Sequence, residues 1–161
     1  MGKGGQAETE QGYMAPRVRQ FSVFLDNRVG KLLELVEQFD EDPIVNICAF
    51  AVHEASDHAV VRVITNHARR AKAILDEHEL PYSQTQVLVV ELVGGLTISR
   101  MCVCLLSAEI NIRFAYPLMI RPNGTPTIAI SVDDVTLAGQ ILRRKSFHLL
   151  GECDLPKPDA A

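Results

Sequence analysis

The sequence contains an internal repeat, which restricts the fold to two copies of one unit. The pair Asn46-Ile47 recurs as Asn111-Ile112, 65 residues later, and the same offset takes Gly30 to Gly95. Farther along the chain the offset becomes 67, as three apolar positions show: Ala71, Ile74 and Leu75 recur as Ala138, Ile141 and Leu142. Shared offsets over a matched order of elements indicate duplicated structural units. We therefore expect two similar units in the chain of 161 residues.

The first copy shows the order of elements that defines the unit. Alternating apolar residues predict a strand at 21–25, and apolar residues spaced three and four apart predict a helix over about 30–41. A hairpin between 44 and 65, a helix capped by Asn66 and a strand that begins near Ser83 complete the copy. Strand, helix, strand, strand, helix, strand is the order of ferredoxin-like folds. We expect an α+β protein of two tandem ferredoxin-like βαββαβ repeats, whose antiparallel sheets carry their helices on one face.

The second copy repeats this order with its own turn and cap residues. It opens with an apolar strand at 87–92, and Asn-Gly at 123–124 is a strong signal for its hairpin turn. Asp133 or Asp134 is expected to cap the last helix, and 148–150 form a short final strand.

The offsets also set the expected boundaries of the units. The first unit takes residues 17–86 and the second takes residues 87–153. Residues 1–16 are rich in Gly, Gln and Glu and are expected to form a flexible tail. Residues 154–161 form a second, Pro-containing tail.

Composition excludes several kinds of partner. The net charge of −4 argues against nucleic acid, whose binding domains are usually strongly basic. No run of 18 apolar residues exists, so no membrane span or membrane partner is expected. The N-terminus lacks the apolar core of a secretion signal, and the four cysteines form no C-x-x-C pair. Cysteines of this kind fit a reducing compartment, so we expect a cytoplasmic protein.

An enzymatic function is not expected either. The sequence has no recognisable nucleophile elbow and no phosphate-binding G-x-x-x-x-G-K-[ST] loop. His53 and His58 flank the first hairpin turn, but two ligands are too few for a metal site. We therefore expect no catalytic residue, no metal and no cofactor.

The segment from Asp26 to Leu32 joins the first predicted strand to the first predicted helix. Asp and Asn followed by Gly make a tight turn that leaves backbone N–H groups free at the helix start. Those groups and the positive end of the helix dipole suit a carboxylate. Two interpretations remain open: Asp26 or Asn27 caps the helix while Gly30 relieves strain, or the loop holds a ligand.

The loop Asn27-Arg28-Val29-Gly30-Lys31-Leu32, followed by a helix and an apolar strand entered through Asn46-Ile47, resembles the ACT domain. The segment 94–116 of the second copy looks similar. The resemblance covers about residues 17–153 and is to stand-alone proteins made of two ACT repeats. It implies an allosteric regulatory module that binds a small effector, most often an amino acid, at an interface between ACT units.

The resemblance also implies where the ligand lies, namely against the loop after the first strand, the start of the first helix and the strand that follows. The residues concerned are Asp26, Asn27, Arg28, Val29, Gly30, Lys31, Leu32, Asn46 and Ile47 in the first copy, and Gly94, Gly95, Leu96, Asn111 and Ile112 in the second. The second loop has no Asn or Asp before its glycines, and either Gly94 or Gly95 could match Gly30. We therefore favour the first loop as the better-formed site.

These observations lead to one preferred function and one alternative. We expect a non-catalytic regulatory protein that senses an amino acid, with a metabolic enzyme as a partner that the resemblance allows. Open sheet edges attract a further chain, so a homodimer is also expected. The alternative is a structural or protein-interaction module that regulates a separate enzyme without binding a ligand itself.

Overall fold

The computed structural model describes residues 8–9, 12–13, 15–26 and 30–158. Within the predicted N-terminal tail, two short strands pair antiparallel, β1 (Glu8–Thr9) with β2 (Gly12–Tyr13). The first unit then consists of β3 (Val18–Asp26), α1 (Lys31–Asp40), β4 (Ile47–Ala55), β5 (His58–Thr65), α2 (Ala68–Glu77) and the start of β6 (Tyr82–Glu91). The second unit consists of the end of β6, α3 (Ile98–Leu106), β7 (Ile112–Pro117), β8 (Thr127–Val132), α4 (Val135–Arg144) and β9 (His148–Leu150). A 3₁₀ turn, Glu152–Asp154, follows.

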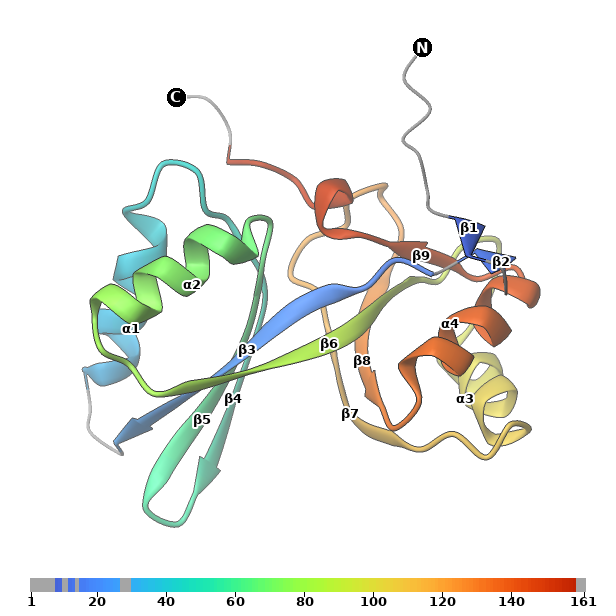
Figure 1. The fold of residues 1–161 in the computed structure, drawn as a ribbon, viewed down its shortest axis with the longest axis horizontal. Coiled ribbons are helices and arrows are strands. Elements are labelled where there is room, and N and C mark those ends of the chain that lie inside the picture. Colours follow the sequence, from blue (N-terminus) through green and yellow to red (C-terminus); the bar gives the residue numbers. More distant parts are fainter. Residues whose placement is uncertain (1–7, 10–11, 14, 27–29, 159–161) are drawn as a thin grey trace.

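The strands form one seven-stranded antiparallel sheet in the order β4-β5-β3-β6-β8-β7, with β9 paired to β6. Each unit thus has the strand neighbours of a ferredoxin-like sheet, and the predicted α+β fold is confirmed (Figure 1).

β6 belongs to both units. Residues 82–87 pair with β3, and residues 88–91 pair with β8. We predicted one strand beginning near Ser83 and another at 87–92, whereas the structure has a single strand through both. The reason lies in the sequence, because 82–91 contain no Gly, Pro, Asn or Asp that would start a turn. The expected boundary between 86 and 87 therefore falls inside a strand.

The helices cover one face of each half of the sheet (Figure 1). In unit 1, Phe21 and Val23 of β3 pack against Leu35 and Phe39 of α1 and Leu75 of α2. In unit 2, the equivalent core includes Leu88, Val90, Met101, Leu105 and Leu142. Alternation along the strands sends every second side chain to these cores.

The opposite face of the sheet makes a third core that joins the units. Val18, Ile64, Val87, Val89, Tyr116, Leu118, Ala129 and Leu150 are buried together there. The sheet curls enough to bring its two outer strands into contact, and the Met119 N–H donates to the Cys48 carbonyl at 2.9 Å.

A buried hydrogen bond and a cation–π contact join the two units across this third core. The Tyr116 hydroxyl of β7 donates to Gln20 Oε1 of β3 at 3.0 Å, and Gln20 Nε2 donates to Ser22 Oγ at 2.9 Å. Burial raises the pKa of the Tyr116 phenol, and Arg62 opposes that rise. The Arg62 guanidinium, from β5, lies 3.9 Å from the centroid of the Phe114 ring of β7. The units are thus joined by specific contacts as well as by apolar packing.

Candidate functional site

Gly30 starts α1 in a left-handed conformation, with φ of 101°. Its carbonyl accepts a hydrogen bond from the Glu34 N–H at 2.9 Å, and no described side chain caps the helix. No described atom outside its chain neighbours lies within 4 Å of the place where a Cβ would project. No described side chain thus takes the first N–H groups of α1, and such groups are suited to a small anion.

The structure describes only some of the predicted site residues near Gly30. Asp26 is the exposed last residue of β3, paired in register with His58. Asn27, Arg28 and Val29 lie outside the described residues. Lys31 forms an exposed ion pair with Glu34 at 3.3 Å, while Leu32 packs against the core of unit 1.

The second loop is built differently. Gly94 and Gly95 are exposed and left-handed, with φ of 58° and 80°, and the Leu96 N–H donates to the Val93 carbonyl at 3.0 Å. α3 begins only after Thr97, whose hydroxyl accepts from the Arg100 N–H at 3.1 Å. A side chain of the protein thus caps α3, whereas α1 has none among its described neighbours. Sequence reasoning missed Thr97, although Thr is a common cap residue.

The loop lengths explain why neither glycine of the second loop matches Gly30. From Asp26 to Glu91, the strand ends, the offset is 65, but from Lys31 to Ile98, the helix starts, it is 67. The second loop is therefore longer by two residues, and Thr97 takes the cap position that Gly30 holds in unit 1.

The backbone N–H groups of Asn46 and Asn111 donate hydrogen bonds to side chains that lie just before α2 and α4. The Asn46 N–H donates to Asn66 Oδ1 at 2.6 Å, and the Asn111 N–H donates to Asp133 Oδ1 at 3.2 Å. The Asn46 side chain also donates to the Pro156 carbonyl, and the Asn111 side chain donates to Asp133 Oδ2, each at 3.2 Å. In each case the side chain is engaged within the protein. Ile47 and Ile112, the next residues, pack against the cores of their units.

The structure shows which residues cap α2 and α4. Asn66 was expected to cap α2, but its side chain bonds Asn46 and the Ile44 carbonyl, and His67 caps the helix instead. His67 Nδ1 accepts from the Arg70 N–H at 3.1 Å. In unit 2, Asp134 caps α4.

Sequence analysis also missed a polar cluster around one buried carboxylate beside the second loop. Glu91 ends β6, as Asp26 ends β3, but its side chain is only 1% exposed. Asn123 Nδ2 donates to Glu91 Oε1, and His148 Nδ1 lies by Glu91 Oε2, each at 2.6 Å. The signal was a single Glu within an apolar strand, which requires partners when buried. Here the protein's own side chains satisfy the carboxylate, so the second loop has less to offer a ligand.

Two other classes of site are absent from the described ranges. No cluster of three or more His, Cys, Asp or Glu residues there could hold a metal ion. No helix within those ranges is both long and apolar enough to span a bilayer.

Known proteins share this architecture. A family model described as an ACT domain pair matches residues 16–157. The chain belongs to that family. Comparison of this ACT domain pair protein with curated proteins finds no match.

Two solved structures resemble this ACT domain pair protein. Protein BT0572 from Bacteroides thetaiotaomicron is 22% identical with a TM-score of 0.75, over 87% of this chain and 96% of that one. The ligand-free regulatory subunit of aspartate kinase from Thermus thermophilus is 12% identical with a TM-score of 0.54, over 82% and 92% of the two chains. At these identities the likeness concerns the fold.

Proposed function

We propose that this ACT domain pair protein is a non-catalytic, allosteric regulator that binds an amino acid at the start of α1. The observation that carries the proposal is the N-terminus of α1 at Gly30, which no side chain among the described residues caps. The likeness of its fold to a regulatory subunit of aspartate kinase supports a regulatory role.

The binding mode follows from the chemistry of a free amino acid. Its carboxylate takes hydrogen bonds from the N–H groups of Gly30 to Leu32, where the helix dipole is positive. Asp26, exposed at the end of β3, accepts from the ammonium group. Asn27, Arg28, Val29 and Lys31 complete this proposed site.

The second loop is proposed as the weaker site. Gly94, Gly95 and Leu96 offer only backbone groups, and Thr97 already caps α3. Asn46 bonds to Asn66 beyond one end of β5, whereas Asp26 pairs with His58 at the other end, so Asn46 lies away from the loop of its own unit. Asn111 is placed likewise in unit 2, and we propose that both residues only hold their strands in position.

The setting in which the protein acts is part of the proposal. All four cysteines are free, which fits a reducing, cytoplasmic compartment. We further propose a homodimer and regulation of a metabolic enzyme. The alternative is an interaction module without a ligand, and the screen described next separates the two.

The test is a thermal-shift screen of the purified protein against the twenty amino acids. A ligand at 100 times its Kd stabilises a protein by about 2.7 kcal/mol. At about 2 to 4 °C per kcal/mol for a chain of this size, the midpoint rises by several degrees. We expect a selective rise for one class of amino acid, and no rise with any of the twenty contradicts ligand sensing.

A matched pair of glycine variants assigns the site. Gly30→Val and Gly124→Val each place a β-branched side chain at a left-handed position with open space around it, so both are strained. Gly124 lies in the turn between β7 and β8, in unit 2 and away from the loop of unit 1. We expect Gly30→Val to abolish the ligand shift and Gly124→Val to retain it. Equal loss in the two variants would place the ligand elsewhere.

A further inference from the structure

Each unit has a hollow between its two helices, and the two hollows occupy equivalent places. The hollow of unit 1 is about 280 Å³ and is lined in part by Ile74 and His78 of α2 and its C-cap. The hollow of unit 2 is about 340 Å³ and is lined in part by Ile141 and Lys145, which stand 67 residues later. The residues that line the two hollows can therefore be compared position by position.

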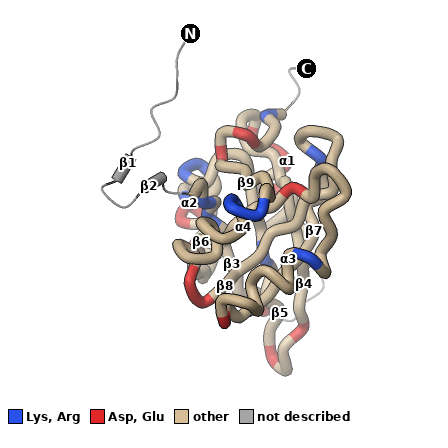
Figure 2. The backbone as a smooth tube through the Cα atoms, turned by 90° about the vertical axis from the view of Figure 1, so that its right-hand side faces the viewer, with Lys and Arg blue, Asp and Glu red and all other residues tan. Residues whose placement is uncertain are grey.

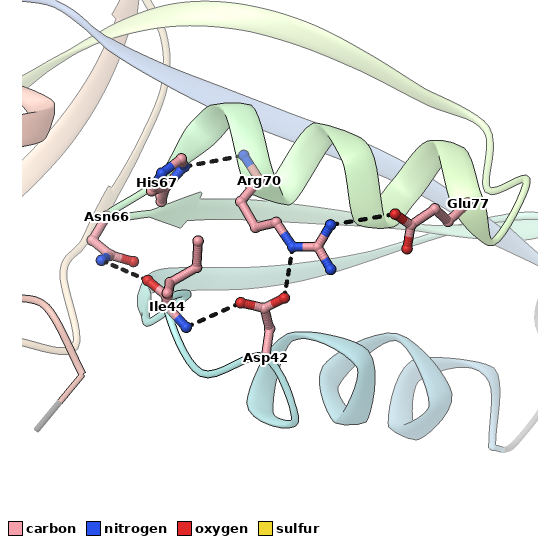
Figure 3. A network of polar contacts seen from close by, with 6 residues as sticks. All are labelled: Asp42, Ile44, Asn66, His67, Arg70 and Glu77. Carbon is pink, nitrogen blue, oxygen red and sulfur yellow. Dashed lines mark hydrogen bonds and ion pairs between the residues drawn. The ribbon is translucent and has the colours of Figure 1, made fainter. Parts of the chain in front are cut away.

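In unit 1 the residues that line the hollow form ion pairs with one another (Figure 3). Arg70 Nε donates to Asp42 Oδ2 at 2.7 Å, and its Nη1 donates to Glu77 Oε1 at 3.3 Å. The Asp42 carboxylate also accepts from the Ile44 N–H at 3.0 Å. Burial opposes the charged form of Asp42, but the Arg70 and Ile44 hydrogen bonds and the Arg70 charge hold its pKa below the ordinary value. The charged groups of Asp42, Arg70 and Glu77 are therefore paired within the protein.

In unit 2 the equivalent positions carry no such network. The residues that replace Arg70 and Glu77 are Leu137 and Arg144, each 67 residues later. Ala108, with its methyl side chain, lines the second hollow where the carboxylate of Asp42 lines the first. Arg100 and Lys145 also line it, and neither forms an ion pair with a carboxylate that the structure describes. The second hollow thus has cations but no anion of its own.

Of the exposed apolar residues on α3 and α4, Val103 lines the second hollow, and Leu106 lies about one turn farther along α3. Ile98, Val103 and Leu106 of α3 are 51%, 57% and 75% exposed, and Leu137 of α4 is 37% exposed. Exposed apolar residues that gather on one surface mark interaction sites more often than scattered ones. In Figure 2, which views this side, Lys and Arg segments lie beside α3 and α4.

α1 shows that the position of α3 in the fold does not require an apolar surface. Leu35 and Phe39 are the buried residues of α1, and Met101 and Leu105 hold the same places on α3. These buried residues align at an offset of 66, one less than the helix starts, because α3 begins one residue later relative to them. At this offset Arg100, Val103 and Leu106 replace three carboxylates of α1, Glu34, Glu37 and Asp40. The same helix surface is acidic in unit 1 and apolar with a cation in unit 2.

We propose that the groove between α3 and α4 is a docking surface for an amphipathic helix of a partner protein, whose carboxylates flank an apolar stripe. The apolar stripe packs on Val103 and Leu106, and the carboxylates pair with Arg100 and Lys145. The partner thereby supplies the anion that Asp42 supplies within unit 1. An amphipathic helix laid in an apolar groove is a common mode of recognition. This surface is separate from the ligand loop of unit 1, so it does not depend on the proposed effector site.

The test uses the full chain and two synthetic helical peptides. Both carry the same leucine stripe, flanked by glutamates in one peptide and by lysines in the other. Fluorescence anisotropy of the labelled peptides measures their binding. We expect the glutamate peptide to bind, with an affinity that falls as salt is added, and the lysine peptide to bind far more weakly.

Matched variants locate the contact. Leu106→Asp should weaken binding of the glutamate peptide by roughly tenfold or more, as expected of an interface anchor. Leu33→Asp, at an exposed leucine of α1, is its control and should leave binding unchanged. Arg100→Glu with Lys145→Glu should abolish binding, whereas Arg19→Glu with Arg69→Glu makes the same change of charge elsewhere and should retain it.

Three results would overturn the proposal. The first is equal binding of both peptides, and the second is an unchanged affinity in Leu106→Asp. The third is a wild-type dimer in sedimentation that becomes a monomer in Leu106→Asp, since a second copy would then occupy the groove. The glycine variants and amino-acid screen report on the effector site alone, so either proposal can fail without the other.

Discussion

Replacing Tyr116 with Phe should destabilise both units, because its hydroxyl joins them. The Tyr116 hydroxyl donates to Gln20 Oε1 at 3.0 Å, and Gln20 is fully buried. Gln20 Nε2 is already engaged by Ser22, so its side chain cannot turn to find a new partner without breaking that bond. The Tyr116→Phe variant would therefore leave a buried carbonyl oxygen without a hydrogen bond.

The magnitude follows from this burial. Leaving a buried acceptor unpaired costs about 1 to 3 kcal/mol. For a chain of this size, that lowers Tm by about 2 to 4 °C for each kcal/mol. The phenyl ring itself stays in place, so little apolar burial is lost and no cavity opens.

Urea denaturation followed by circular dichroism measures the effect, since the chain has no Trp for fluorescence. We expect a lower midpoint, an unchanged m value and one transition for the whole chain. A Gln20→Met variant and the double variant complete a thermodynamic cycle. The double variant should cost less than the sum of the single ones, because both polar partners are then gone. Additive costs, or a Tyr116→Phe variant as stable as wild type, would refute the reasoning.

Three further predictions test other parts of the structure. Asp42→Asn should lower stability at neutral pH. The pKa of Asp42 in the folded protein lies below its usual 3.8, so the ionised carboxylate stabilises the fold above pH 3.8, and this stabilisation is lost as the pH falls through the folded pKa. Urea midpoints of both proteins should therefore converge in acid, and a gap that persists would contradict this. Cys102 and Cys153 are exposed and should react promptly with Ellman's reagent. Cys48 and Cys104 are buried and should react only on unfolding. Burial also raises the pKa of the Cys48 thiol to about 12. Asn66→Ala should cost about 1 to 2 kcal/mol in urea denaturation, since it removes the acceptor for the Asn46 N–H and the donor to the Ile44 carbonyl, and a loss below about 0.5 kcal/mol would count against this role.

The fold was predictable because the same order of sequence patterns occurs in both halves of the chain. Apolar spacing identified the helix that became α1, and recurrence of Ala71, Ile74 and Leu75 as Ala138, Ile141 and Leu142 identified α2 and α4. Local patterns of this kind depend on residues near one another in the chain. The lack of a turn former in 82–91 was a local sign of one continuous strand, but local patterns could not show that this strand pairs with both β3 and β8, which come from distant parts of the sequence.

The candidate site was less predictable, for a related reason. Asn66 and His67 are both plausible caps in the sequence, and the choice depends on the contact between Asn66 and Asn46, twenty residues earlier. The repeated Asn-Ile pair pointed to ligand contact by resemblance, whereas each Asn side chain is bonded within the protein. Glu91 likewise stood out only as a charged residue in an apolar strand, because His148 lies far along the chain. The turn at Gly30 before α1, by contrast, was predicted from the local sequence alone.

The strand shared by the two units has a consequence for how the chain is made and how it can change. During synthesis, β3 emerges long before residues 82–87, so unit 1 cannot complete its sheet until the first strand of unit 2 is also being made. An insertion or deletion inside β6 would shift the strand register of both units at once. The two copies therefore have no cut point between them: a fragment of either unit keeps its sheet intact only if it takes the whole of β6, which leaves the other unit without its share of that strand.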